Sequence, residues 1–392
     1  MDATNVMTSA RLGRWAVAAM FFANGFLVGS WAPQIPLVLT RLEIRESTLG
    51  ILILVFGLGA LVAMPWAGYL ISRHGSKNVL RLFALTSTVG LLVVALSPNP
   101  WLAAPAMFFF GGVVGGTDVA MNTNAVAVER RLGRAIMSAS HGFWSLGGFA
   151  GGGLGGLFIQ NYGYLPHAGF VTLVALAIVL GACFYLVGED RPVAQEHRKF
   201  SFPSSPTVYL VGMMALFSMI PEGAILDWAA LYLRQELGAD IATAGFAFAA
   251  FSATMASMRF LGDGVRNRFG AVTTLRVSSL IAAVGILLGG LAPNAWVAIA
   301  AFAFAGLGIA NMVPIAFSAA GNQEGMAAGT GMSVVTTMGY SGILIAPSAI
   351  GFIGEHTGFA PIFMVLSGLL VVVCLMAGLA HRADFKAHYP AE

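Results

Sequence analysis

The sequence predicts an all-α membrane protein in which twelve transmembrane helices form two six-helix bundles related by a parallel duplication. Three observations predict this class: a composition too apolar for water, a series of long apolar segments, and an internal repeat. Of the 392 residues, 58% are hydrophobic and 9% are charged, and the mean hydropathy is +0.82. A soluble domain carries about 25% charged residues, so this chain cannot cover a water-facing surface.

Long apolar segments without strict alternation predict helices, because lipid admits only helices and closed barrels. A helix needs about 20 mostly apolar residues to cross the hydrocarbon. We therefore expect twelve spans, at residues 14–40, 48–71, 79–97, 101–128, 135–160, 165–188, 208–233, 243–262, 276–292, 296–320, 327–353 and 361–380.

The distribution of Lys and Arg predicts the orientation, since cytoplasmic loops are enriched in both. If both termini are cytoplasmic, every Lys and Arg falls on the inner side except Arg41, Arg45 and Arg234. We therefore expect a multi-pass protein of the bacterial inner membrane with both termini in the cytoplasm. The isoelectric point near 9.0 follows from this bias and requires no nucleic-acid partner.

The two halves of the chain repeat each other at one offset. Pro98-Asn99 recurs as Pro293-Asn294, and Arg73 recurs as Arg268, both 195 positions later. Parallel duplication is one of the architectures of transporters, in which the substrate site lies between the two halves near mid-membrane.

A polar stretch between the sixth and seventh spans divides the chain almost in half. It contains charged residues followed by a Pro/Ser segment. We expect an N-terminal bundle at 1–188, a cytoplasmic linker at 189–207 and a C-terminal bundle at 208–392.

The loop after the second span carries a recognisable motif. It reads Gly-Tyr-Leu-Ile-Ser-Arg-His-Gly-Ser-Lys from Gly68 to Lys77. This resembles the Gly-x-Leu-Ala-Asp-Arg-x-Gly-Arg-Lys signature of the major facilitator superfamily, with Ser72 in place of the usual Asp, and a weaker copy begins at Asp263. The resemblance implies the major facilitator fold and alternating access by rocking of two bundles. We expect a cytoplasmic gate formed by Gly68, Arg73, Gly75, Lys77, Asp263 and Arg268, although the basic residues are equally explained as topology signals.

Within that superfamily the chain looks most like the fucose-permease-like branch and its uncharacterised bacterial inner-membrane relatives. Three motifs carry the resemblance: Asp-x-x-x-Asn from Asp118, His-Gly-x-Trp-Ser-Leu-Gly-Gly from His141, and Glu-Gly-x-x-x-Asp-Trp from Glu222. The resemblance implies that Asp118 takes part in proton coupling. The acid usual in the first span is absent, and Asn24 is the nearest polar residue.

Three acids lie inside predicted spans, where a charge costs roughly 2.5–3.5 kcal/mol on insertion scales. Asp118 shares a helix face with Asn122 and is a candidate for proton coupling, the alternative being a structural cap. Glu222 follows Pro221, which weakens the helix, and is a candidate for proton or substrate binding or a buried structural bond. Asp227 lies on another face of the helix. A role in an outer gate or in helix packing is at least as well supported there as contact with the substrate.

The remaining candidates are polar or aromatic residues of the spans. His141 could relay protons with Asp118 or be a buried structural histidine. The expected substrate-binding residues are Asn24, Trp31, Gln34, Asn122, Trp144, Asp227, Trp228, Asn311 and Tyr340. Either Trp31 or Trp228 could instead anchor the protein at the membrane interface. The glycine-rich strip of 147–155 is expected to allow close helix packing.

Two functions remain open: proton-coupled symport of a small polar solute such as a sugar or polyol, and proton-coupled export of drugs by the same fold. A membrane enzyme is disfavoured, since no metal-spaced His/Cys cluster or nucleophile motif is present. We expect no cofactor and no metal. The expected partners are a small solute, protons and lipid, and the superfamily resemblance implies a monomer.

Overall fold

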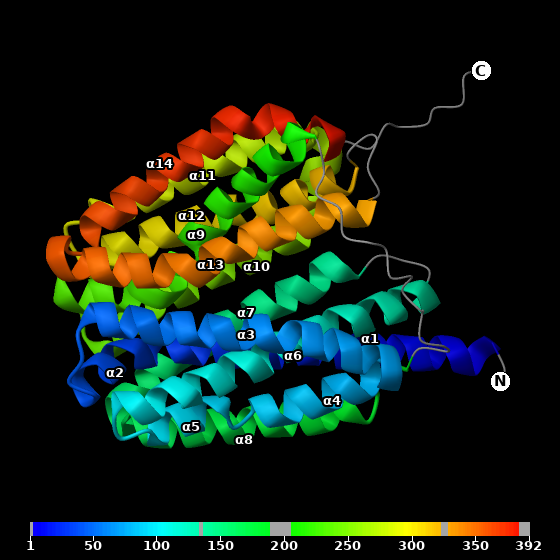
Figure 1. Ribbon diagram of the computed structural model, residues 1–392, viewed down its shortest axis with the longest axis horizontal. Helices are drawn as coiled ribbons and strands as arrows, with labels where there is room; N and C mark the ends of the chain where they lie inside the picture. The colour runs from blue at the N-terminus through cyan, green and yellow to red at the C-terminus, as the bar shows by residue number, and fades with distance from the viewer. Residues whose placement is uncertain (1–2, 133–135, 189–204, 323–327, 384–392) are drawn as a thin grey trace.

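The computed structural model describes residues 3–132, 136–188, 205–322 and 328–383, and within these ranges it is helical without strands. Two groups of helices lie side by side (Figure 1), one made by α1 to α8 and the other by α9 to α14. Most of the expected linker, residues 189–204, lies outside the described ranges.

The first group contains eight α-helices and a short 3-10 turn: α1 Ala3–Trp31, η1 Ala32–Gln34, α2 Ile35–Arg41, α3 Glu46–His74, α4 Ser76–Ser87, α5 Gly90–Leu96, α6 Pro100–Leu132, α7 Met137–Tyr162 and α8 Tyr164–Cys183. The second group contains α9 Pro206–Gln235, α10 Ile241–Phe269, α11 Ala271–Gly290, α12 Ala295–Gly321, α13 Ala328–Thr357, α14 Ala360–Met376 and η2 Ala377–Ala383.

Eleven helical segments in the described part of the chain are long and apolar enough to cross a membrane. The expected fifth span, 135–160, is the 26-residue helix α7, which is not among the eleven. Glycine and polar residues replace aliphatic ones along α7, so its apolar signal is weak. The helices also run past the predicted edges; α3 covers Glu46–His74 against the expected 48–71, because hydropathy marks only the hydrocarbon part of a helix.

The repeat detected in the sequence recurs in the helix boundaries. α3 ends before Gly75 (φ 76°) and α10 ends before Gly270 (φ 80°), 195 positions later. The turns before α8 and α14 contain Gly163 (φ 89°) and Gly358 (φ 77°) at the same offset. These positive φ angles favour glycine, so the duplication preserves turn geometry as well as sequence.

Helix α7 connects the two groups, because it packs against both α1 and α10. The contact with α1 is made at backbone distance: a Cβ at Gly25 would lie 1.9 Å from the carbonyl oxygen of Trp144. On the other side, a Cβ at Gly245 of α10 would lie 2.8 Å from the carbonyl oxygen of Gly152. The expectation that the glycine-rich strip allows close helix packing is confirmed.

The described N- and C-terminal helices, α1 and η2, begin and end at the same end of the molecule, which we call the terminal end (Figure 1). We call the end with the 42–45 turn the opposite end. There the Arg41 guanidinium donates to the carbonyl oxygens of Ala95 (2.6 Å) and Ser97 (2.7 Å) at the end of α5. Such bonds satisfy carbonyl groups that a helix terminus leaves unpaired.

We predict that Gly25→Ala destabilises the protein by about 1–3 kcal/mol, the usual cost of overpacking, because the new methyl group would meet the Trp144 carbonyl. Gly169→Ala is the matched control, since no heavy atom lies within 4 Å of its Cβ position in α8. Thermal denaturation in detergent micelles measures both. Equal melting temperatures for the two variants would contradict the close contact.

Candidate functional site

Asp118 of α6 lies at the interface between the two groups of helices. Its carboxylate accepts from Asn122 Nδ2 at 3.3 Å, and the same amide donates to the Asp118 carbonyl oxygen at 2.8 Å. Asp118 and Glu222 both lie within electrostatic range of the Tyr340 hydroxyl on α13. Tyr340 is 38% exposed. A residue of the second group is therefore within electrostatic range of the α6 carboxylate.

Glu222 of α9 is paired with an arginine inside the membrane. Arg259 Nη2 lies 3.3 Å from Glu222 Oε1, and the two side chains are 13% and 21% exposed. Arg259 Nη1 also donates to Ser145 Oγ of α7 at 2.7 Å. Ser252 Oγ of α10 donates to the Ser145 carbonyl oxygen at 2.7 Å. One arginine therefore joins α9, α10 and α7, and so bridges the two groups.

His141 lies one helical turn before Ser145 on α7. It is within electrostatic range of Arg259, and its ring packs edge-on to Phe21 with centroids 5.1 Å apart. The histidine therefore lies beside the arginine–glutamate pair.

Asn24 and Trp144 form a second polar contact, within the first group. Trp144 Nε1 donates to Asn24 Oδ1 at 2.9 Å, and Asn24 Nδ2 donates to the Val114 carbonyl oxygen at 3.3 Å. These bonds connect α1, α7 and α6 near the Gly25 contact. Trp144 Nε1 and Asn24 Nδ2 therefore each donate to a protein oxygen.

Three other expected substrate-binding residues, Gln34, Asn311 and Trp31, are buried. Gln34 donates to the Tyr164 carbonyl oxygen at 3.0 Å and contacts His167 Nδ1 at 2.9 Å, both on α8. Asn311 Oδ1 faces Gly262 of α10, and Trp31 is 4% exposed within the apolar core.

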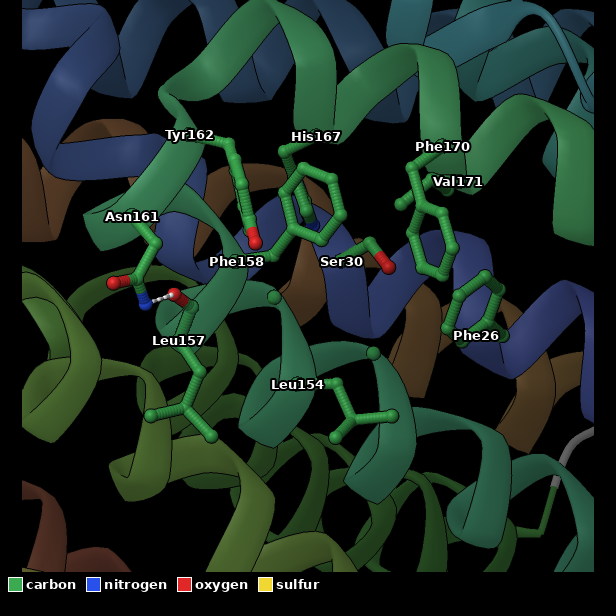
Figure 2. A pocket seen from close by; sticks show the side chains of 12 residues that line it. Phe26, Ser30, Leu154, Leu157, Phe158, Asn161, Tyr162, His167, Phe170 and Val171 are labelled. Atoms are coloured by element: carbon green, nitrogen blue, oxygen red, sulfur yellow. Dashed lines mark hydrogen bonds between the residues drawn. The ribbon is translucent and has the colours of Figure 1, made fainter.

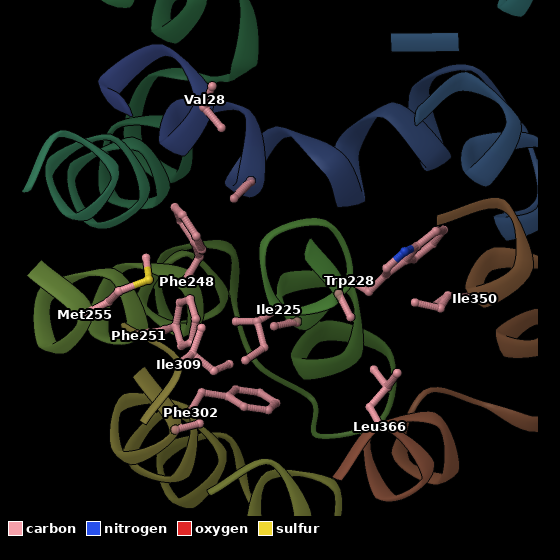
Figure 3. Close-up of a cluster of buried hydrophobic side chains, with 14 of the residues drawn as sticks. Val28, Ile225, Trp228, Phe248, Phe251, Met255, Phe302, Ile309, Ile350 and Leu366 are labelled. Carbon is pink, nitrogen blue, oxygen red and sulfur yellow. The ribbon is translucent and has the colours of Figure 1, made fainter. Parts of the chain in front are cut away.

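Trp228 and Asp227 are buried within the second group. The Trp228 ring stacks on Phe359 at 5.2 Å and lies in the apolar cluster with Ile350 and Leu366 (Figure 3). Asp227 is 6% exposed. The structure therefore places Asp118, Asn122, Glu222, His141 and Tyr340 within electrostatic or hydrogen-bonding range of one another's partners. It leaves Gln34 and Trp228 in separate surroundings, while Asn311 packs against Gly262, one turn of α10 from Arg259.

The expected gate residues lie at the terminal end of α3 and α10. Arg73 is exposed and its guanidinium lies over the Tyr69 ring at 4.8 Å, while Arg268 lies over Phe269 at 5.5 Å. A Cβ at Gly68 would meet nothing within 4 Å, and Gly75 ends α3. Lys77 is half-buried, near Gly188. The Asp263 side chain lies outside the described part of the chain.

The two groups make polar contacts at the opposite end. Arg45 Nη1 lies 3.4 Å from Glu355 Oε1, and Gln235 Nε2 donates to Glu46 Oε1 at 2.7 Å. The backbone N–H of Ala242 donates to Gln160 Oε1 at 3.0 Å. The turns of the two groups are therefore held together at this end.

Arg259 is the residue that sequence reasoning missed. The charge distribution places it among the basic residues of the inner side, whereas the structure places it in the middle part of α10, paired with Glu222. A signal was available, because Arg259 falls inside the expected span 243–262. An arginine in hydrocarbon needs a partner, and Asp118, Glu222 and Asp227 were the acids within the spans.

In the described ranges, no group of three or more His, Cys, Asp or Glu side chains could hold a metal ion. The arrangement instead offers ionisable and hydrogen-bonding groups from both halves at one depth. The sequence profile described as Major Facilitator Superfamily matches residues 17–221 and 207–390. The chain belongs to this superfamily.

Among curated relatives, this superfamily member is 35% identical over 360 residues to an uncharacterised MFS-type transporter of Yersinia pestis, covering 91% of this chain and 93% of the relative. It is 34% identical over 368 residues to an uncharacterised transporter of Sinorhizobium fredii, covering 92% and 96%. The protein is therefore a multi-pass membrane transporter; the finer resemblance to the fucose-permease-like branch stays a prediction.

Solved structures share the superfamily fold at low identity. The nucleoside transporter NupG aligns with a TM-score of 0.68 and 14% identity, covering 94% of this chain and 98% of that one. A bacterial homologue of the human lysosomal transporter Spinster, in an inward-facing and occupied conformation, aligns with a TM-score of 0.70 and 14% identity, covering 95% and 98%. The expected fold class is confirmed.

For this transporter we predict that Arg259 and Glu222 are energetically coupled. Arg259→Gln or Glu222→Gln alone should cost about 3 kcal/mol, because each leaves a charge of a buried pair unmatched. The double variant should lose less than the sum, with a coupling energy of about 1–3 kcal/mol.

The matched control is the Arg45–Glu355 pair, in which Arg45 is 81% exposed. Its double-mutant cycle should give less than about 1 kcal/mol. Unfolding in detergent micelles measures both cycles. Additive losses at Arg259 and Glu222 would show that the two side chains act independently.

Proposed function

We propose that this transporter moves a small polar solute, such as a sugar or polyol, by proton-coupled symport through alternating access. The observation that carries the proposal is that Asp118 of one half and Glu222 of the other both lie within electrostatic range of Tyr340, and that Glu222 is paired with Arg259. These groups are contributed by both halves, which is where a duplicated transporter binds its substrate.

The proposed coupling site is Asp118. A carboxylate at this depth carries the cost of an intramembrane charge, and the side chain that donates to it is the neutral amide of Asn122. Glu222 differs, because Arg259 already balances its charge. Protonation of Asp118 would remove its charge, so that the two groups of helices could rock against each other at low cost. Release of the proton on the other side would return the transporter to its starting state.

The solute would be held by neutral hydrogen-bonding groups of both halves. Asn122 donates to Asp118, Tyr340 lies within electrostatic range of the same carboxylate, and Ser145 accepts from Arg259. Hydroxyl-rich solutes match this mixture of amide and hydroxyl groups, which can both donate and accept. His141, beside Arg259, is the proposed second proton group.

The proposed orientation puts both termini in the cytoplasm of a bacterial cell. In that orientation the contacts between the halves favour an inward-facing state. The polar contacts between the halves, Arg45–Glu355 and Gln235–Glu46, lie at the opposite end. At the terminal end Arg73 and Arg268 are exposed and lie over rings of their own helices. We propose that each of these arginines pairs with an acidic residue of the other half when that end closes.

We predict that Asp118→Asn abolishes accumulation of solute but leaves exchange intact. A potential of 100 mV acting on one proton supplies about 2.3 kcal/mol, which is about 50-fold accumulation; the variant should fall to about onefold. Proteoliposomes containing a pH-sensitive dye, challenged with a panel of hexoses, pentoses and polyols, measure proton entry and uptake together.

The matched control is Asp240→Asn, since Asp240 caps α10 outside the membrane through Thr243 N–H at 2.7 Å, and Asn caps about equally well. Full accumulation by Asp118→Asn would assign Asp118 a structural role. Extrusion of a lipophilic dye by the wild type, with no sugar or polyol moving protons, would favour the drug-export alternative.

We predict that Tyr340→Cys reacts with a membrane-impermeant maleimide from the cytoplasmic side. The parent should carry Cys183→Ser and Cys374→Ser, which removes both native thiols. In the same parent Arg45→Cys, on an 81% exposed side chain at the opposite end, should react only from the other side. Intact cells and inverted vesicles distinguish the two. Labelling of Tyr340→Cys in intact cells would contradict the inward-facing assignment.

A further inference from the structure

Two helix crossings related by the internal repeat join the halves toward the opposite end. At the first, a Cβ at Gly245 of α10 would lie 2.8 Å from the carbonyl oxygen of Gly152 on α7. At the second, a Cβ at Gly50 of α3 would lie 2.8 Å from the carbonyl oxygen of Pro347 on α13. The two pairs of residues keep the offset of 195 positions, so α3 meets α13 as α10 meets α7.

The same helix faces continue one turn closer to the opposite end. A Cβ at Gly156 of α7 would lie 3.0 Å from the carbonyl oxygen of Ile241 on α10. A Cβ at Gly351 of α13 would lie 2.5 Å from the carbonyl oxygen of Glu46 on α3. These pairs keep the repeat offset as well. Because residues four apart share one face of a helix, α7 and α13 each present a continuous face to the other half.

One turn beyond these glycines, each crossing ends in a helix cap supplied by the other half. Gln160 Oε1 of α7 accepts from the backbone N–H of Ala242, in the first turn of α10, at 3.0 Å. Glu355 Oε2 of α13 accepts from the backbone N–H of Ser47, in the first turn of α3, at 3.3 Å. Both the acceptors and the donors are repeat mates. We call these two contacts the inter-half caps, because first-turn N–H groups have no partner within their own helix.

The two capped helices differ in what each provides for itself. Asp240 precedes α10, and its side chain accepts from the backbone N–H of Thr243. The equivalent position before α3 is Arg45, which makes no side-chain cap, because a guanidinium has no acceptor. Among the described residues, Glu355 is the side chain that accepts from the first turn of α3. The start of α3 therefore depends on the other half, whereas the start of α10 has a cap of its own.

The ion pair of Glu355 with Arg45 accounts poorly for this arrangement. The Arg45 side chain is 81% exposed, and exposed ion pairs contribute little to stability. The repeat-related crossing has no such pair, because Gln160 is neutral and Asp240 replaces the arginine. The bond to a first-turn N–H group is what the two crossings share.

The other face of α7 is turned away from this contact. Leu154, Leu157, Phe158 and Asn161 contribute to the lining of a cavity of about 290 Å³ between α7 and α8, whereas Gln160 does not (Figure 2). This cavity lies within the first half. The last turns of α7 are therefore held to the second half through the face that contacts α10.

We propose that the inter-half caps of Gln160 and Glu355 hold the opposite end closed, and that both break when this end opens. The proposal rests on the alternating access proposed above, because opening of one end is a step of that cycle. In the open state α10 keeps its cap at Asp240, whereas the first turn of α3 is left to water. Opening therefore costs more at α3, and Glu355 contributes more than Gln160 to closure.

The test measures the distance between the halves at the opposite end. Spin labels are attached at Pro98→Cys and Pro293→Cys, which are exposed repeat mates in the turns before α6 and α12. The parent carries Cys183→Ser and Cys374→Ser, so no native thiol is labelled. Double electron–electron resonance on the purified full chain in nanodiscs then reports the populations with short and long distances, without a solute or a proton gradient.

Removal of a cap should open this end. Glu355→Ala should raise the ratio of long to short distances about two- to thirtyfold, the range for loss of a helix cap, and Gln160→Ala should raise it by a smaller factor. Glu355→Gln keeps an acceptor oxygen, as Gln160 does in the other crossing, and should stay closer to the parent than Glu355→Ala. Gln160→Ala decides the test by itself if Glu355→Ala does not fold.

The matched control is a carboxylate that caps a helix at the same end within one half. Glu236, at the end of α9, accepts from the backbone N–H groups of Phe359 and Ala360 at the start of α14. Glu236→Ala should lower the melting temperature but leave the distance ratio unchanged. Arg45→Ala should also leave the ratio unchanged.

An unchanged ratio in both Glu355→Ala and Gln160→Ala would overturn the proposal, as would an equal rise in Glu236→Ala. A rise in Arg45→Ala as large as that in Glu355→Ala would assign closure to the ion pair and overturn it too. Since no solute enters these measurements, failure of the proposed sugar or polyol symport would leave their result standing.

Discussion

The rest of the structure depends on the position of α7, whose backbone lies directly against the backbones of α1 and α10. The Gly25–Trp144 and Gly245–Gly152 approaches leave no room for side chains, so both neighbours are held at one separation and one register. This helix carries Ser145 and His141 to the interface, and its Gly151 and Gly155 line a cavity between α7 and α8. In lipid, where apolar surface supplies little drive for helix association, close packing of small residues is the main source of such contacts.

A second constraint is the cost of charge in hydrocarbon. The protein meets it in two ways at nearly the same depth. Arg259 and Glu222 balance each other, with Ser145 taking a further guanidinium hydrogen. Asp118 accepts from the neutral amide of Asn122 and has the Tyr340 phenol within electrostatic range. A balanced pair can stay charged throughout a conformational cycle, whereas an unbalanced carboxylate gains from protonation. The proposed coupling role of Asp118 rests on this difference.

The duplication gives both halves the same turn geometry but different polar side chains within their helices. Gly75 and Gly270 end equivalent helices with the same positive φ, and the helix starts at Pro100 and Ala295 keep the offset. The intramembrane residues differ, since Asp118 belongs to the first half while Arg259 and Glu222 belong to the second. Backbone geometry is preserved because each bundle must satisfy the same helix ends, whereas the interface requires complementary side chains that two identical halves would not supply.

The amino-acid sequence by itself determined the membrane class, the two halves, the helix order and the acids of the spans, because hydrophobic length, repeat offset and isolated charges are local properties. Tertiary structure alone decided the partners. It paired Arg259 with Glu222, brought Tyr340 of one half to Asp118 of the other, and turned Gln34 toward His167. Helix rotation and depth settle such pairings, and both depend on which glycines meet which backbone. A residue within a span can be identified from composition, but its neighbour lies on another helix far away in sequence.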